Sequence, residues 1–188
     1  MVKVDYIVNR VFTSRTYILS DDGRDEVWLV DCGDVEKVGR PVKGILLTHS
    51  HSDHIYGLNI VLKKNPSVRI YTNAFGYKAL ADPKLNISRY HAEYDDFVLT
   101  NMNAVEVLKE GDMMEIFDQN VNVYETPGHD KSCLCYKIGN CFFSGDSYIP
   151  GLKVTAPFPH SNKTKAIDSE KRIIELSAGC VVYPGHEI

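Results

Sequence analysis

Six consecutive residues, His-Ser-His-Ser-Asp-His at positions 49–54, constrain this chain more than any other stretch. They place three imidazoles and a carboxylate directly after the apolar run at 44–48. In an apolar core, each of these side chains would need its own hydrogen-bond partner. Histidine and aspartate at such close spacing are typical of metal ligands instead. We therefore interpret the stretch as a metal-binding loop at the end of a buried strand.

The size and composition of the chain are those of an ordinary folded protein. Its 188 residues are 44% hydrophobic and 24% charged, close to the average for globular domains, so we expect one domain spanning residues 1–188. The formal net charge is −4, and the absence of any long run of Lys or Arg argues against a nucleic-acid partner. A small-molecule substrate, including an anionic one, fits this balance.

Neither the first residues nor the cysteines indicate export or a membrane. Residues 1–6 lack the charged region and apolar segment of a secretory signal, and no stretch reaches the roughly 20 apolar residues of a membrane span. The five cysteines are an odd number at irregular spacings, so we expect reduced side chains that pack in the core. These features predict a cytoplasmic protein without a membrane partner. The sequence carries no indication of its oligomeric state.

Alternating β-rich and helical runs predict an α/β fold. Turn formers separate β-rich runs at 2–12, 16–20 and 26–31, which predicts an antiparallel opening. The strand at 44–48 precedes a helix, because apolar residues recur at helical spacing after residue 54 and stop at a basic pair. We expect helices also at 74–81 and 165–177, and strands at 68–72, 105–108, 113–117, 121–125, 132–138, 141–144 and 180–183, with a second sheet opening at 105–108.

Two long loops interrupt this pattern, at 82–103 and 150–165. The first contains several aromatic residues among acidic ones. Such an insertion is typical of a lid over a binding site, or equally of a surface loop that is packed by its own side chains.

Five of the seven histidines fall at the ends of predicted strands. In extended backbone His49 and His51 point the same way, whereas the adjacent Asp53 and His54 can point toward a neighbouring position. This arrangement suits two metal ions side by side. The later residues His129, Asp146 and His186 each follow a glycine, which permits a sharp turn and removes a side chain where an ion would approach.

The order of these motifs resembles that of the metallo-β-lactamase-fold hydrolases. Four motifs carry the resemblance, and together they span essentially the whole chain: 48–54, 126–129, 144–146 and 183–186. The resemblance implies the four-layer αββα sandwich of that family. It also implies that Asp31, at the end of an early strand, orients the first motif; taken alone, Asp31 would be a helix cap or a turn residue.

The resemblance further implies two metal sites side by side. It assigns three ligands to each ion and one bridging ligand: His49, His51 and His129; Asp53, His54 and His186; and Asp146 between them. Asp53 and Asp146 would be the catalytic carboxylates. Zinc is the expected metal, although imidazole and carboxylate also bind iron and manganese. Two cations about 3.5–4 Å apart lower the pKa of a shared water from about 15.7 toward neutrality, so a metal-bridging hydroxide would be the nucleophile.

Within this superfamily, the resemblance favours a hydrolase of a small ester, thioester, lactone or phosphodiester. The true β-lactamases of this fold commonly carry a different residue at the position of His54, which argues against antibiotic hydrolysis as the native activity. Glyoxalase II is the nearest familiar comparison, but its glutathione-binding helical domain would follow the last motif, and here the chain stops at Ile188. The pattern also departs from that enzyme at 130–133 and 147–151, beside the expected metals, which leaves the substrate open.

The residues that would contact the substrate are less constrained. We predict Lys131, which follows an expected ligand by two residues, together with His160 and Tyr94, against the alternative that these are ordinary loop residues. Two other functions are also compatible with the motifs: a persulfide dioxygenase-like oxidoreductase that uses a single iron, and a non-catalytic metal-binding domain. The complete set of second-site ligands favours the hydrolase.

Overall fold

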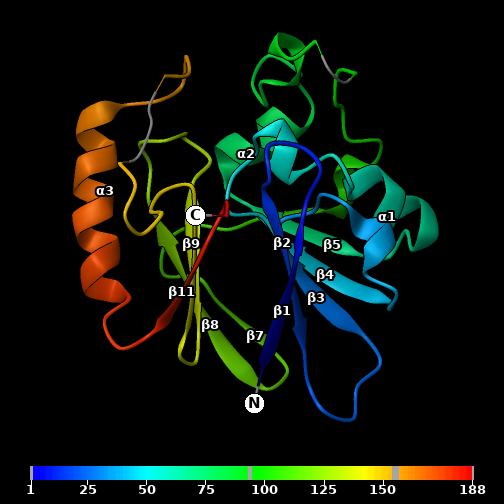
Figure 1. The fold of residues 1–188 in the computed structure, drawn as a ribbon. Helices are drawn as coiled ribbons and strands as arrows, with labels where there is room; N and C mark the ends of the chain where they lie inside the picture. The colour runs from blue at the N-terminus through cyan, green and yellow to red at the C-terminus, as the bar shows by residue number, and fades with distance from the viewer. Residues whose placement is uncertain (1, 93–94, 154–156, 188) are drawn as a thin grey trace.

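Two β-sheets pack face to face, and helices cover the outer face of each sheet (Figure 1). The computed structural model describes residues 2–92, 95–153 and 157–187. Helices α1 (Leu58–Lys64) and α2 (Ala74–Leu80) flank the first sheet, and α3 (Lys163–Leu176) covers the second. The predicted four-layer αββα sandwich is therefore confirmed.

The strands of the first sheet follow one another in chain order: β1 (Lys3–Val8), β2 (Arg15–Ser20), β3 (Val27–Val30), β4 (Val42–Leu46), β5 (Arg69–Thr72) and β6 (Val105–Val107). The first three are antiparallel, as predicted, and β3 to β6 are parallel. The prediction that the run at 105–108 opens the second sheet was wrong, because β6 pairs with β5. A strand of three residues carries too little pattern to identify its partner.

The second sheet has the order β11-β10-β9-β8-β7. Its strands are β7 (Met113–Ile116), β8 (Gln119–Glu125), β9 (Leu134–Ile138), β10 (Cys141–Gly145) and β11 (Val181–Pro184). The predicted hairpin of β9 and β10 is present, with Gly139 at a φ of 56° in its turn. Short 3-10 helices occupy Val35–Lys37, Ser52–His54, Ser88–Tyr90 and Met102–Ala104.

Alternation along the central strands separates the apolar core into layers. Leu29 and Ile45 face α1 and α2, whereas their neighbours Val30 and Leu46 face the second sheet. The side chains that meet Val30 and Leu46 from that sheet include Val121, Val123, Tyr136 and Phe143. On the outer side of the second sheet, Cys135 and Phe142 pack under Ile173 of α3. Each sheet is buried on both faces, which a four-layer fold requires.

The cysteines agree with the expectation about the core. All five cysteines are free, and four of them are buried, as predicted for packing residues. Among the helices of the described ranges, none combines the length and the apolar character that crossing a membrane demands.

Trp28 lies across β4 at a position where that strand has no side chain. Trp28 pairs with Gly44, and its ring stacks on Tyr71 of β5 with centroids 5.7 Å apart. A Cβ atom on Gly44 would lie 2.4 Å from the Trp28 ring. Glycine at this position therefore lets one aromatic side chain span three strands in the layer between the sheets.

We expect Gly44→Val to lower the free energy of unfolding by about 1–3 kcal/mol, because the new side chain must displace the indole. Trp28 is the only tryptophan of the chain, so its fluorescence should shift as well, and denaturant titration measures both effects. Lys43→Ala, at an exposed neighbouring position, should change stability by no more than about 0.5 kcal/mol. A Gly44→Val protein as stable as the wild type would contradict this account of the packing.

Candidate metal centre

Seven side chains from four segments converge at one edge of the sandwich, where strands of both sheets end. Residues 49–54 follow β4, and His129, Asp146 and His186 follow β8, β10 and β11. Three groups of their ligand atoms each lie within 4.8 Å of one another: His49, His51 and His129; His49, His54 and Asp146; and Asp53, His54 and His186. The sequence-predicted ligands are thus brought together from positions as far apart as 49 and 186.

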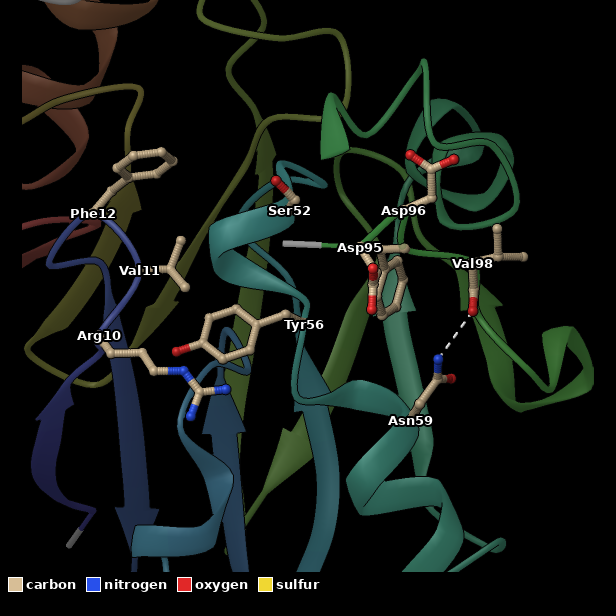
Figure 2. Close-up of a pocket in the computed structure, with 10 residues that line it drawn as sticks. Arg10, Val11, Phe12, Ser52, Tyr56, Asn59, Asp95, Asp96 and Val98 are labelled. Carbon is tan, nitrogen blue, oxygen red and sulfur yellow. Dashed lines mark hydrogen bonds between the residues drawn. The ribbon is translucent and has the colours of Figure 1, made fainter. Parts of the chain in front are cut away.

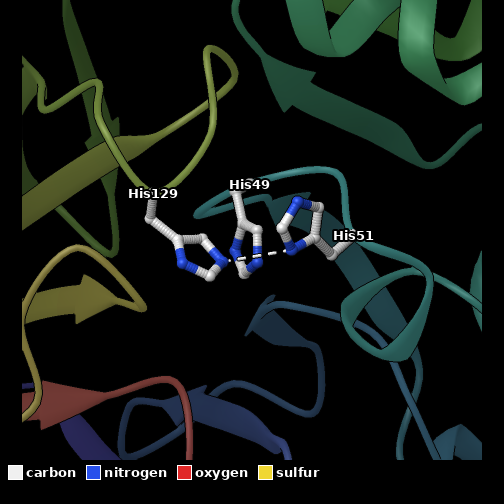
Figure 3. Close-up of side chains that lie close together, drawn as sticks. All are labelled: His49, His51 and His129. Atoms are coloured by element: carbon white, nitrogen blue, oxygen red, sulfur yellow. Dashed lines mark hydrogen bonds between the residues drawn. The ribbon is translucent and has the colours of Figure 1, made fainter. Parts of the chain in front are cut away.

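The first group consists of three imidazoles that point toward one another (Figure 3). His129 Nε2 lies 3.1 Å from His51 Nδ1, and all three rings are buried. One zinc ion about 2.0–2.1 Å from each nitrogen would fit between atoms at this separation. The group therefore has the composition and spacing of a three-histidine metal site.

The second group combines a carboxylate with two imidazoles. His54 Nε2 lies 3.3 Å from His186 Nε2, and Asp53 Oδ2 lies 3.2 Å from the first nitrogen and 3.4 Å from the second. Asp146 stands between the two groups, with Oδ2 3.5 Å from His129 Nε2 and 3.2 Å from His186 Nε2. A carboxylate in that position can contribute to both groups at once.

Three atoms of this cluster are buried and have no hydrogen-bond partner within the described part of the chain. They are Nε2 of His49, Oδ1 of Asp146 and Nε2 of His51, which faces Asp130 Oδ2 at 3.7 Å. Buried polar groups are normally satisfied, because an unpaired one costs about 1–3 kcal/mol. Nitrogen and carboxylate oxygen are the donors that zinc, iron and manganese accept. The orphaned atoms of His49 and Asp146, together with the donor set, fit bound metal ions.

Burial and charge act unevenly across the cluster. Desolvation and the nearby His54 hold the pKa of His49 well below its usual value. Burial also disfavours the charged form of His54, but the carboxylates of Asp53 and Asp31 outweigh it and raise the pKa of His54 well above its usual value. Burial would raise the pKa of Asp146, yet the surrounding imidazoles hold it well below the usual range. Its carboxylate is therefore ionised, as a metal ligand must be.

Asp31 lies behind the first motif and contacts it through both carboxylate oxygens. Oδ1 accepts a hydrogen bond from the Thr48 backbone N at 2.8 Å, and Oδ2 accepts one from Thr48 Oγ1 at 2.7 Å. His54 Nδ1 lies 2.9 Å from Oδ2, so this nitrogen donates its proton and Nε2 remains available to the cluster. Asp31 thus orients His54 and the strand end that precedes it.

Asp130 occupies a similar place behind His51, and the sequence analysis assigned it no role. Its Oδ2 lies 3.7 Å from His51 Nε2, on the far side of the ring from His129. Its Oδ1 accepts hydrogen bonds from the backbone N and the hydroxyl of Ser132, whose Oγ also accepts one from the Ser50 backbone N. An acidic residue directly after an expected ligand was the available signal. In the sequence, Asp130 was noted only because it departs from the glyoxalase II pattern.

A cavity of about 290 Å³ opens onto the candidate ligands. Besides ligands, its lining includes Phe12, Ile87, His91 and Phe158. The Phe158 ring packs against His51 with centroids 4.7 Å apart. Phe12, Ile87 and Phe158 were not predicted, because only the fold brings these loops over the cluster.

Two of the three predicted substrate residues, Lys131 and His160, lie beside Phe75. Lys131 Nζ is 5.6 Å from the centre of the Phe75 ring, and His160 packs against the same ring at 5.2 Å. Neither residue lines the 290 Å³ cavity. Tyr94 lies outside the described residues.

Comparisons of the sequence with a family model and with curated proteins agree with each other. Residues 12–186 match the family model of the metallo-beta-lactamase superfamily. A hydroxyacylglutathione hydrolase of Hydrogenovibrio crunogenus is 28% identical over 184 residues, which are 92% of this chain and 58% of that protein. The chain thus spans less than two thirds of the length of this curated relative.

Solved structures share the fold at lower sequence identity. BLEG-1, a B3 metallo-beta-lactamase, superposes with a TM-score of 0.88 at 23% identity and covers 99% of this chain and 92% of its own. A protein crystallised in a di-iron-bound form gives a TM-score of 0.79 at 22% identity, over 98% of this chain and 93% of its own. At these identities the likeness shows the fold alone.

We expect zinc to stabilise chelator-treated protein, because an ion that binds only the folded cluster shifts unfolding by mass action. At 1,000 times the dissociation constant the gain is about 4 kcal/mol, or roughly 8–16 °C in Tm for a chain of this size. Thermal unfolding with and without zinc measures it. His129→Ala should reduce the rise in Tm. A wild-type Tm that does not change when zinc, iron or manganese is added would contradict the candidate site.

Asp130→Asn should weaken metal binding about 10–100-fold, because the carboxylate that faces the outer nitrogen of a metal-binding histidine fixes its orientation and raises its basicity. Competition with a chromogenic chelator measures the affinity. The matched control is Asp118→Asn, since the Asp118 side chain is 84% exposed and remote from the cluster. Equal affinities for the two variants would show that Asp130 does not support the site.

Proposed function

The chain belongs to the metallo-β-lactamase superfamily, and from this premise we propose that it is a metal-dependent hydrolase with two divalent ions held side by side. Its substrate would be a small ester, thioester, lactone or phosphodiester. The observation that carries the proposal is the position of Asp146, whose Oδ2 lies within 3.5 Å of His129 Nε2 in one ligand group and within 3.2 Å of His186 Nε2 in the other.

We assign the first ion to His49, His51 and His129 and the second to Asp53, His54 and His186, with Asp146 shared. When bound, such ions act as Lewis acids and lower the pKa of a coordinated water toward neutrality. Zinc is the first candidate. Iron remains a strong second, since a structural neighbour has been crystallised in a di-iron-bound form and the same donor set binds both metals.

Side chains of the protein orient the ligands, exclude water and transfer protons. Asp31 holds His54 in one tautomer, and Asp130 faces the outer nitrogen of His51. Phe12 and Phe158 line the cavity and exclude water from the reacting bond. We assign proton transfer to the carboxylates of Asp53 and Asp146, which both present oxygens to the same space.

Two further parts of the proposal concern substrate and domain organisation. A thioester is the first class to test, because a relative that shares 28% of its residues over 184 positions is named a hydroxyacylglutathione hydrolase. We also propose that residues 1–188 form one domain. The family match over 12–186 supports this, as does the core that joins both sheets.

Metal-loaded protein should hydrolyse at least one member of a panel of thioester, ester, lactone and phosphodiester substrates. Asp146→Asn should lower kcat by about 10²–10⁴-fold, the range for losing a positioned acid–base group, whereas Asp168→Asn on the exposed face of α3 should not. Steady-state kinetics and metal analysis of each sample test both statements.

Steady-state kinetics and metal analysis also distinguish the hydrolase from the two alternative functions. One iron per chain with oxygen consumption would support a single-iron dioxygenase-like enzyme instead. Full metal content without turnover on the panel would support a non-catalytic metal-binding domain. A β-lactam belongs in the panel because a B3 metallo-beta-lactamase shares the fold, and turnover of it alone would overturn the substrate classes proposed here.

A further inference from the structure

A second, larger cavity has a volume of about 730 Å³, and Figure 2 shows the residues that line it. One wall is the loop between β1 and β2, with Arg10, Val11 and Phe12; the opposite wall is formed by Phe97 and Val98 of the 82–103 insertion. Its volume falls in the range of about 300–1,000 Å³ that is typical of small-molecule sites. The cavity is large enough to hold much of a substrate.

The two cavities are neighbours. Phe12 lines both of them. Ser52 lines the larger one and lies in the chain between His51 and Asp53, which line the smaller one. A molecule that reaches the candidate ligands past Phe12 can therefore extend into the larger cavity.

Two polar side chains that line the larger cavity already have partners within the protein. Tyr56 donates its hydroxyl hydrogen to Asp34, and the Asn59 amide donates to the backbone oxygen of Val98 and accepts from Thr100. The guanidinium of Arg10 lies over the Tyr56 ring, 5.5 Å from its centre, and the Arg10 side chain is 69% exposed. At Tyr56 and Asn59 a polar occupant would give up its hydration for groups that are already engaged.

Two acidic residues complete the lining on the insertion side. Asp96 forms an ion pair with Arg89, and Asp95 is exposed. Arg89 offsets the charge of Asp96, and Arg10 on the opposite wall offsets that of Asp95, so the lining favours neither an anionic nor a cationic occupant.

What remains available in the cavity is apolar surface. Phe12 is 49% exposed and Val98 is 45% exposed, although both are large hydrophobic residues. Val11 adds to this surface, and Phe97 also lines the cavity although it is only 8% exposed. Burial of apolar groups against such walls is the main gain that an occupant can make.

We propose that the larger cavity holds the uncharged, apolar part of the substrate, an alkyl or aryl group, while the scissile bond lies at the metal centre. The inference rests on the proposed hydrolase function and names its substrate class. It also gives the 82–103 insertion a role, because Phe97 and Val98 form the wall that selects the group. Lys131 and His160 take no part in this selection.

The test compares p-nitrophenyl acetate, butyrate and hexanoate with zinc-loaded protein. The value of kcat/KM should rise about fourfold for each added methylene, which is the ratio expected for about 0.8 kcal/mol per buried methylene. Val98→Trp fills the cavity and should lower the hexanoate-to-acetate ratio at least tenfold, and Val98→Asp should lower it too. Val181→Trp on β11, where the wild-type valine is 52% exposed, is the matched control and should keep the ratio.

Binding of the neutral fluorescent probe N-phenyl-1-naphthylamine provides a readout that does not depend on turnover. Its fluorescence should rise with the wild type and with Val181→Trp, and much less with Val98→Trp. Ester turnover without a chain-length preference would overturn the cavity assignment but not the hydrolase function. The same holds if Val98→Trp and Val181→Trp give equal hexanoate-to-acetate ratios and equal probe fluorescence. No turnover of any ester, with probe binding lost only in Val98→Trp, would uphold the cavity and count against ester hydrolysis.

Discussion

The buried carboxylate of Asp31 connects the fold to the candidate metal centre. It accepts hydrogen bonds from the backbone and the hydroxyl of Thr48 and contacts His54 Nδ1 at 2.9 Å. Asp31 itself stands at a φ of 60° directly after β3, where the chain turns away from the sheet. A buried charge is tolerated only when it is paired and hydrogen-bonded. The end of β3 therefore fixes the end of β4, and with it the direction in which the histidine cluster leaves the sheet.

The rest of the centre repeats this arrangement across the two sheets. Asp130 lies behind His51 as Asp31 lies behind His54, at 3.7 Å instead of 2.9 Å, and its support comes from Ser132, two residues before β9. Each group of candidate ligands thus has a carboxylate outside it that belongs to the scaffold. Because one support follows β3 and the other follows β8, packing of the two sheets against each other sets the relation between the two groups.

Local patterns in the sequence predicted most strands and helices, and the resemblance to a known family implied the four layers and the seven candidate ligands. Contacts between distant loops were beyond both. Leu29 and Val30 face different layers, but the apolar strand VWLV carries no polar alternation that tells one layer from the other. The pairing of β6 with β5 could not be predicted either, because three residues do not specify a partner. Phe12 and Phe158 were missed for a related reason: each lines the cavity through loop placement, and neither has a motif around it.

The loop between β1 and β2 shows why the metal centre and the larger cavity cannot be treated separately. Phe12 and Thr13 both have positive φ angles, 51° and 54°, which for non-glycine residues persist only where surrounding contacts enforce them. Those contacts are with the ligand segments: His186 Nδ1 lies 2.9 Å from the Phe12 backbone oxygen, and Ser14 Oγ donates to the Asp53 backbone oxygen at 2.8 Å. The wall of the cavity is therefore held by the same segments that carry the candidate ligands. A change in this loop should alter both the position of His186 and the space open to a substrate.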